Sequence, residues 1–160
     1  MPAKDAELRI RENLGLAAAC TKRGDLEAAM GHAKTVLSLD PGNEIALGLL
    51  SGIYVQLNLR DRAESCLRKI LAVNSHNALA RYQLGLLQFE GGQPQAALDT
   101  WAPALEDDKE FMCHFHSALA LLQLQKPQPA RPLLEHCAPR IPRNHELYPR
   151  LQELLEQLRS

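Results

Sequence analysis

The residue types best suited to chemistry gather in one short stretch of the sequence. Cys113, His114 and His116 lie within four residues of each other, and His136 and Cys137 follow on the next expected helix. Cys113 and His116 are three residues apart, so they share a helix face, and sulfur with imidazole nitrogen can ligate zinc. A structural zinc site needs four converging ligands, but Cys137 is expected to pack in the core as a small hydrophobe. The pattern favours packing and ligand contact, and we predict no metal site.

Motifs for catalysis are missing from the sequence. It has no glycine-rich phosphate loop between a strand and a helix, no nucleophile elbow and no carboxylate pair at a productive spacing. The pair Gly91-Gly92 is typical of a turn between helices. We therefore predict no enzyme, no catalytic residue and no cofactor.

Composition narrows the class of protein. Of 160 residues, 46% are hydrophobic and only 4% aromatic, and the net charge is −1. Such a balance disfavours disorder and nucleic-acid binding, and no apolar run approaches the ~18 residues of a membrane span. The first ten residues lack the apolar core of a signal peptide. The four cysteines lack metal or redox spacing, so we expect a cytoplasmic, reducing location without membrane insertion.

A helical unit from Gly24 to Asn43 organises the elements around these residues. Gly24 accepts the left-handed conformation past a helix end, Asp25 caps the next helix, and Asp-Pro at 40–41 stops that helix. An alanine recurs at equal intervals down the chain, as Ala29, Ala63 and Ala97. A fixed period of this length, about 34 residues, indicates a repeat array.

The repeat resembles the tetratricopeptide repeat, a helix-turn-helix of this length. The first repeat matches that pattern at Leu16, Ala17, Gly24, Asp25, Ala29, Leu37, Asp40, Pro41 and Asn43. The second matches at Leu47, Leu50, Ser51, Tyr54, Ala63, Leu67, Ile70, Leu71 and Asn77, and the third at Leu84, Gly85, Gly92, Ala97, Trp101, Ala104 and Leu105. A looser fourth fits at Phe115, Ala118, Leu119, Leu122, Ala130, Leu134 and Pro142 if one residue is missing from its internal turn.

The resemblance implies an all-α fold, a right-handed α-solenoid of about four helical hairpins. We expect Pro103 to kink or end the second helix of the third repeat, because proline cannot donate the helical hydrogen bond. The segments are an extension of the first helix (1–9), repeats at 10–43, 44–77, 78–111 and 112–145, and a C-terminal capping helix (146–160).

The apolar stripe of the C-terminal segment fits two structural roles, a capping helix or a contact between two chains. Leu147, Leu151, Leu154 and Leu158 are helically spaced, as a capping helix over the last repeat requires. The same four leucines form a short heptad-like seam that could join two chains. Capping is the favoured interpretation, because two heptads make a short coiled coil.

In this family the first (A) helix of each repeat lines the concave groove, mainly through positions two, five, nine and twelve. The mapped residues are mostly apolar, and such a patch on a soluble chain indicates an interaction surface. We refer to the predicted binding residues as the A-helix face. They are Leu14, Ala18, Ile45, Gly48, Gly52, Val55, Leu79, Tyr82, Leu86, Phe89, Cys113 and His116.

Two glycines stand out on this face. Gly48 and Gly52 each cost about 1 kcal/mol relative to alanine inside a helix. They either let a partner approach the backbone closely, or they admit a neighbouring A helix or a bulky residue such as Tyr82. The sequence leaves both explanations open.

The ligand class follows from what the A-helix face carries and lacks. Relatives that grip acidic chaperone tails use lysine, asparagine and arginine at places held here by Leu14, Ala18, Leu49, Leu79 and Gln83. We therefore predict a non-catalytic adaptor or chaperone-like scaffold that binds an apolar peptide or amphipathic helix. The alternative is a scaffold that forms a homodimer through the groove or the C-terminal helix. A lesser one is a bacterial secretion-type chaperone.

Overall fold

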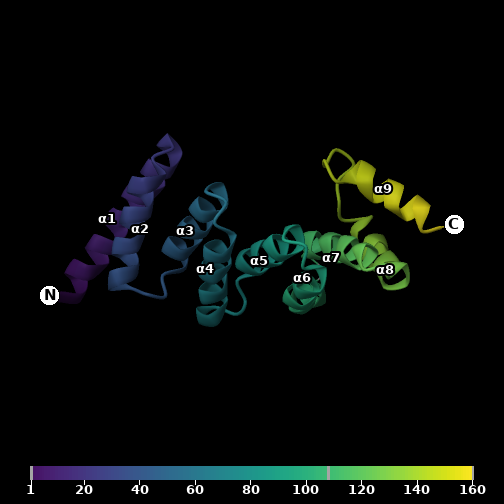
Figure 1. Cartoon of the computed structure of the whole chain (residues 1–160), viewed down its shortest axis with the longest axis horizontal. Coiled ribbons are helices and arrows are strands. Elements are labelled where there is room, and N and C mark those ends of the chain that lie inside the picture. Colours follow the sequence, from purple (N-terminus) through teal and green to yellow (C-terminus); the bar gives the residue numbers. More distant parts are fainter. Residues whose placement is uncertain (1, 108, 160) are drawn as a thin grey trace. The chain divides into compact units, whose positions relative to one another are not determined.

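The computed structural model of the chain describes residues 2–107 and 109–159. Positions 1, 108 and 160, which fall in three of the predicted segments, lie outside the described residues. The described residues form α-helices and one 3-10 helix (η1) and contain no strand (Figure 1). In chain order the elements are α1 (Pro2–Arg23), α2 (Leu26–Leu39), α3 (Glu44–Gln56), α4 (Arg60–Val73), α5 (Ala78–Glu90), α6 (Pro94–Trp101), η1 (Ala102–Glu106), α7 (Phe111–Gln123), α8 (Pro127–Cys137) and α9 (Tyr148–Gln157).

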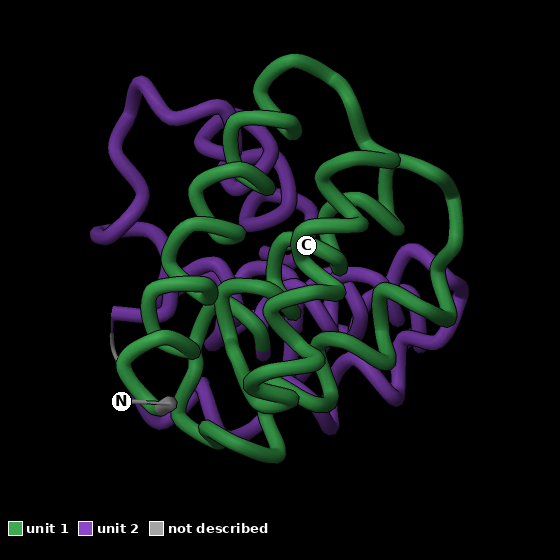
Figure 2. Tube along the Cα trace, turned by 90° about the vertical axis from the view of Figure 1, so that its left-hand side faces the viewer, with its two compact units in different colours: residues 1–80 green, residues 81–160 purple. Residues whose placement is uncertain are grey.

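The chain divides into two compact units, residues 1–80 (unit 1) and residues 81–160 (unit 2), coloured green and purple in Figure 2. In unit 1, α1 packs against α2, α3 packs against α4, and α3 also contacts α1 and α2. Small side chains fill the positions where these helices meet, which lets their axes approach closely. The alanines that are fully buried in unit 1 are Ala17, Ala29, Ala33, Ala46 and Ala63.

The helix ends of unit 1 follow the chemistry expected from the sequence. Gly24 has a φ of +78°, in the left-handed region, and the Asp25 carboxylate accepts a hydrogen bond from the Ala28 amide at 3.1 Å. Asn43 caps α3 in the same way, accepting from the Ala46 amide at 3.1 Å. The predicted roles of Gly24 and Asp25 are therefore confirmed.

A side-chain bridge ties two of the helix-to-helix corners of unit 1 together. Glu44 stands at the start of α3, and its Oε2 accepts hydrogen bonds from Asn77 Nδ2 at 2.7 Å and from Asn74 Nδ2 at 3.2 Å. Asn77 also accepts, through its side-chain oxygen, a bond from the Ala80 amide at 2.9 Å. One carboxylate thus joins the corner that follows α2 to the corner that follows α4.

The third repeat ends as its proline predicts. α6 stops at Trp101 and gives way to the 3-10 helix η1, in which Pro103 is the second residue. Proline lacks the amide hydrogen that a longer α-helix would need at this point. The expectation that Pro103 ends the helix early is therefore confirmed.

The register of the fourth repeat differs from the prediction. Residues with positive φ mark the turn inside each repeat. Gly24, Asn58 and Gly92 are evenly spaced by one repeat period, but Gln125 follows Gly92 one position too soon. Likewise α5 begins one full period after α3, whereas α7 begins one position short of a full period after α5. The missing residue therefore lies before α7 and not in the internal turn of the fourth repeat, so that expectation is wrong. A shift of one residue rotates a helix position by about 100°.

Two clusters of buried residues contribute to the core of unit 2. One gathers around Trp101, which is fully buried with Ala97, Cys113 and Ala120. The other lies between α7, α8 and α9. Its buried members are Phe115, Ala118, Ala130, Leu134, Cys137, Ile141, Leu151 and Leu154.

The C-terminal helix α9 covers an apolar face of unit 2. Leu151 is fully buried and Leu154 is nearly so, and Leu147 and Leu158 pack against the same cluster. These are the four leucines that could instead have formed a seam between two chains. All four leucines therefore contribute to packing within unit 2, which fits a capping role for α9, and that role stays a prediction.

Candidate functional site

The A-helix face of unit 1 is exposed and apolar. Ile45 and Val55 on α3 and Leu79 at the start of α5 have exposed fractions of 62%, 48% and 65%. On α1, Ala18 is exposed and Leu14 is half-buried. Exposed large aliphatic side chains in repeat-equivalent positions form the kind of surface that binds other proteins.

The two glycines of α3 face open space within unit 1. A Cβ added at Gly48 or Gly52 would have no heavy atom of the described residues of unit 1 within 4 Å, the helix's own nearby backbone aside. The explanation that they admit α1 as a neighbour therefore fails. Close approach of a partner stays a prediction, since packing inside unit 1 does not account for either glycine.

In unit 2 the corresponding residues are half-buried around Trp101. Tyr82, Leu86 and Phe89 on α5 pack against the Trp101 cluster. The ring centroids of Phe89 and Trp101 are 6.3 Å apart. The face here is thus formed by large side chains that the fold already holds in place.

His116 completes this aromatic group from α7. Its ring centroid lies 5.5 Å from that of Tyr82, edge to face, and 5.9 Å from that of Trp101. Burial lowers the pKa of His116 below its ordinary value, although the Met112 carbonyl, 2.9 Å from Nδ1, and the Glu90 carboxylate act in the opposite direction. The structure therefore brings His116 together with Tyr82, as a shared site requires.

Cys113 is not on the surface, contrary to the prediction. It is fully buried against Trp101, and burial raises the pKa of its thiol to about 12. The error follows from the missing residue before α7. A constant repeat period places each predicted position of α7 one residue too far along the chain. In the observed register, the α7 residues that correspond to Ile45, Gly48, Gly52 and Val55 are Met112, Phe115, Leu119 and Leu122.

The sequence offered one signal for the observed register. Pro94 and Pro127 each occupy the first position of a second helix, and the interval between them is one residue shorter than the repeat period. This spacing shows that one residue is lost between the two turns but not on which side of α7. Phe115 is buried, whereas Met112, Leu119 and Leu122 are half-buried.

The sulfur and imidazole groups do not converge as zinc ligands would. The rings of His114 and His136 are stacked, with centroids 4.0 Å apart and planes at 13°. Nearly parallel rings direct their nitrogen lone pairs side by side and not toward one ion. Cys137 is buried, and its sulfur donates to the Phe111 carbonyl at 3.4 Å. Among residues 2–107 and 109–159, no three His, Cys, Asp or Glu side chains form a group that could hold a metal.

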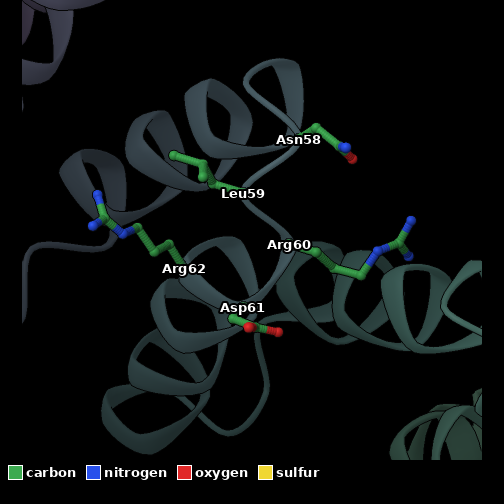
Figure 3. A pocket seen from close by; sticks show the side chains of 5 residues that line it. All are labelled: Asn58, Leu59, Arg60, Asp61 and Arg62. Atoms are coloured by element: carbon green, nitrogen blue, oxygen red, sulfur yellow. The ribbon is translucent and has the colours of Figure 1, made fainter.

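A separate depression of about 350 Å³ lies at the turn between α3 and α4 (Figure 3). Five consecutive residues line it, Asn58 to Arg62. Arg62 turns toward α3, where its guanidinium carbon lies 5.8 Å from the centroid of the Tyr54 ring. A depression formed by one turn of the chain lacks the converging groups of a binding site.

No helix within the described ranges is both long and apolar enough to cross a membrane.

Two models of known protein families match parts of this chain. The family model described as "Tetratricopeptide repeat" matches residues 21–75, and the one described as "Anaphase-promoting complex, cyclosome, subunit 3" matches residues 56–137. No curated protein sequence matches the chain.

Solved structures of similar fold cover most of the chain. MamA is 21% identical with a TM-score of 0.76, over 94% of this chain and 86% of MamA. PilF of Pseudomonas aeruginosa is 22% identical with a TM-score of 0.76, over 96% of this chain and 69% of PilF. YrrB, described as a TPR protein with an unusual peptide-binding site, is 18% identical with a TM-score of 0.72, over 91% of this chain and 84% of YrrB.

These likenesses confirm the all-α repeat fold expected from the sequence. The two family models together span residues 21–137, a range that includes the positive-φ turn residues Gly24, Asn58, Gly92 and Gln125. The chain belongs to the tetratricopeptide repeat family.

Proposed function

We propose that the chain is a non-catalytic protein-interaction module whose A-helix face binds an apolar or amphipathic segment of another protein. The observation that carries this proposal is the exposure of Ile45, Val55 and Leu79 in unit 1. Covering them would remove apolar surface from water at about 25 cal/mol per Å² before ordering costs. Adaptor and chaperone-like roles share this binding step.

Membership of the tetratricopeptide repeat family supports a role in binding other proteins. Tetratricopeptide repeats are scaffolds for protein contact, and the fold carries a peptide-binding site in YrrB. Gly48 and Gly52 leave the backbone of α3 open within unit 1, which would let a partner's side chain come close. We further propose a reducing location such as the cytoplasm, which suits four buried free thiols.

The test is binding after substitution on the face. A partner captured from native lysate and identified by mass spectrometry would be titrated against Val55→Glu and Leu86→Glu. A charge on this face must be desolvated or must block contact, so we expect each substitution to weaken binding at least about tenfold. Leu16→Glu is the matched control, because Leu16 and Val55 are both 48% exposed and Leu16 lies on the opposite side of α1 from Ala18.

Unchanged binding by folded Val55→Glu and Leu86→Glu proteins would show that the A-helix face is not the site. The rival role, in which a second copy fills the face, makes a different prediction. Light scattering across a concentration series would then show a dimer that Val55→Glu dissociates. A monomer at all concentrations supports binding of a different protein.

A further inference from the structure

The exposed apolar face of unit 1 is bordered by cations on α1. Arg11, Ala18 and Lys22 are exposed and share one face of this helix, because they are spaced by seven and four residues. Half-buried Leu14 lies on the same face. Arg11 and Ala18 stand one repeat period before Ile45 and Gly52, in equivalent positions of consecutive hairpins. The cations and the exposed aliphatic side chains therefore lie on the same side of the A-helix layer.

Acidic residues are sparse on this side. No acidic residue occurs in α3 after Glu44, whose Oε2 is held by Asn74 and Asn77. Between Arg11 and Lys22 the one acid is Glu12, which is rotated by about 100° from Arg11. Nearer the start of α1, Lys4 and Glu7 share the face and offset each other. The central and C-terminal parts of this face are therefore apolar with a positive border.

We propose that the segment bound by unit 1 is acidic as well as amphipathic. This inference rests on the proposed function and specifies in addition that the bound segment carries negative charge. Its apolar side chains would contact Ile45, Val55 and Leu79, and its carboxylates would face Arg11 and Lys22. These two cations lie about three helical turns apart on α1, or about 16 Å along the axis. A helical partner would accordingly carry acidic residues about three turns apart.

The effect of charge should be modest and sensitive to salt. Exposed ion pairs each strengthen binding by up to about fivefold, and salt screens them. A basic ligand would replace the two attractions to Arg11 and Lys22 with two repulsions. We therefore expect an acidic ligand to bind about tenfold more tightly than a basic one of equal apolar surface.

The probes are two synthetic amphipathic peptides of about 16 residues with an identical leucine face. One carries glutamate on its flanks and the other carries lysine at the same places. Fluorescence anisotropy with the full chain should show about tenfold tighter binding of the glutamate peptide at low salt, and a smaller difference at high salt. The double variant Arg11→Glu/Lys22→Glu should invert this preference.

The matched control is Arg9→Glu/Lys34→Glu, which makes the same change in net charge. Arg9 points away from the Arg11 side of α1, and Lys34 lies on α2. Equal binding of both peptides, or an equal effect of the two double variants, would overturn the inference. In that case loss of both peptides in Val55→Glu would still support the proposed function. Failure of the chain to bind either peptide would overturn both.

Discussion

The indole of Trp101 lies directly against the backbone of Gly85, and a Cβ at residue 85 would overlap the ring. The indole Nε1–H donates to the Tyr82 carbonyl at 3.2 Å, which fixes the ring one turn before Gly85 on α5. A glycine on α5 therefore allows the one tryptophan of the chain to be fully buried. The same indole supports the aromatic group of Tyr82 and His116.

Gly85→Ala should destabilise the protein by about 1–3 kcal/mol, because the indole must move to make room for the methyl group. Gly48→Ala is the control, since a Cβ there meets no described atom of unit 1. It should stabilise the protein by about 0.5–1 kcal/mol through the helical preference of alanine. Urea unfolding followed by far-ultraviolet circular dichroism, which reports helices of both units, gives both values, and equal effects would contradict the contact.

Acid should destabilise the protein partly through His116. Burial lowers the pKa of His116 in the folded chain, so the unfolded chain binds the proton more readily. The free energy of unfolding therefore falls as pH drops below the ordinary histidine range, and this loss is absent above that range. His116→Gln should lose less stability than wild type between about pH 7 and pH 5. Parallel pH profiles for the two proteins would refute this prediction.

Two cysteines should be unreactive in the folded protein. Burial raises the pKa of Cys113 and of Cys137 to about 12, so at about pH 8 only about one thiol in ten thousand is ionised. Iodoacetamide labelling read by mass spectrometry should leave both unmodified in the native chain and modify both in urea. Rapid native labelling of either residue would show that its site opens.

The C-terminal helix should contribute directly to the stability of unit 2. Leu151 is fully buried in the cluster between α7, α8 and α9, so Leu151→Ala should cost about 2–5 kcal/mol. Glu156→Ala, on an exposed position of α9, should change stability by less than about 0.5 kcal/mol. Chemical unfolding measures both. A negligible cost at Leu151 would mean that α9 does not act as a cap.

Local signals allowed much of the fold to be predicted. Gly24 and Asp25 act within one turn of their own position, and Pro103 ends α6 for a reason that involves only its own backbone. The buried alanines also recur at a period that the sequence displays openly. Such features need no knowledge of distant contacts, so the hairpins and their turns follow from residue type.

The fourth repeat could not be placed in register from its residues. Asn43 caps α3 through its side chain, whereas Glu110 precedes α7 without a side-chain cap bond. The start of α7 is therefore unmarked in the sequence, and a constant repeat period places Cys113 at the surface position that Met112 occupies in the structure. The stacking of His114 on His136 was also beyond prediction, because it depends on how α7 and α8 pack.

The bridge from Glu44 to Asn74 and Asn77 bears on the cooperativity of unit 1. In a repeat array each hairpin is stabilised by its neighbour, and fraying proceeds from the ends when neighbours are weakly coupled. Glu44 belongs to the corner before α3, whereas both asparagines belong to the corner after α4. Opening either corner breaks the hydrogen bonds between Glu44 and the two asparagines, which weakens the other corner as well. The hairpin of α3 and α4 is therefore expected to melt at both corners in one step.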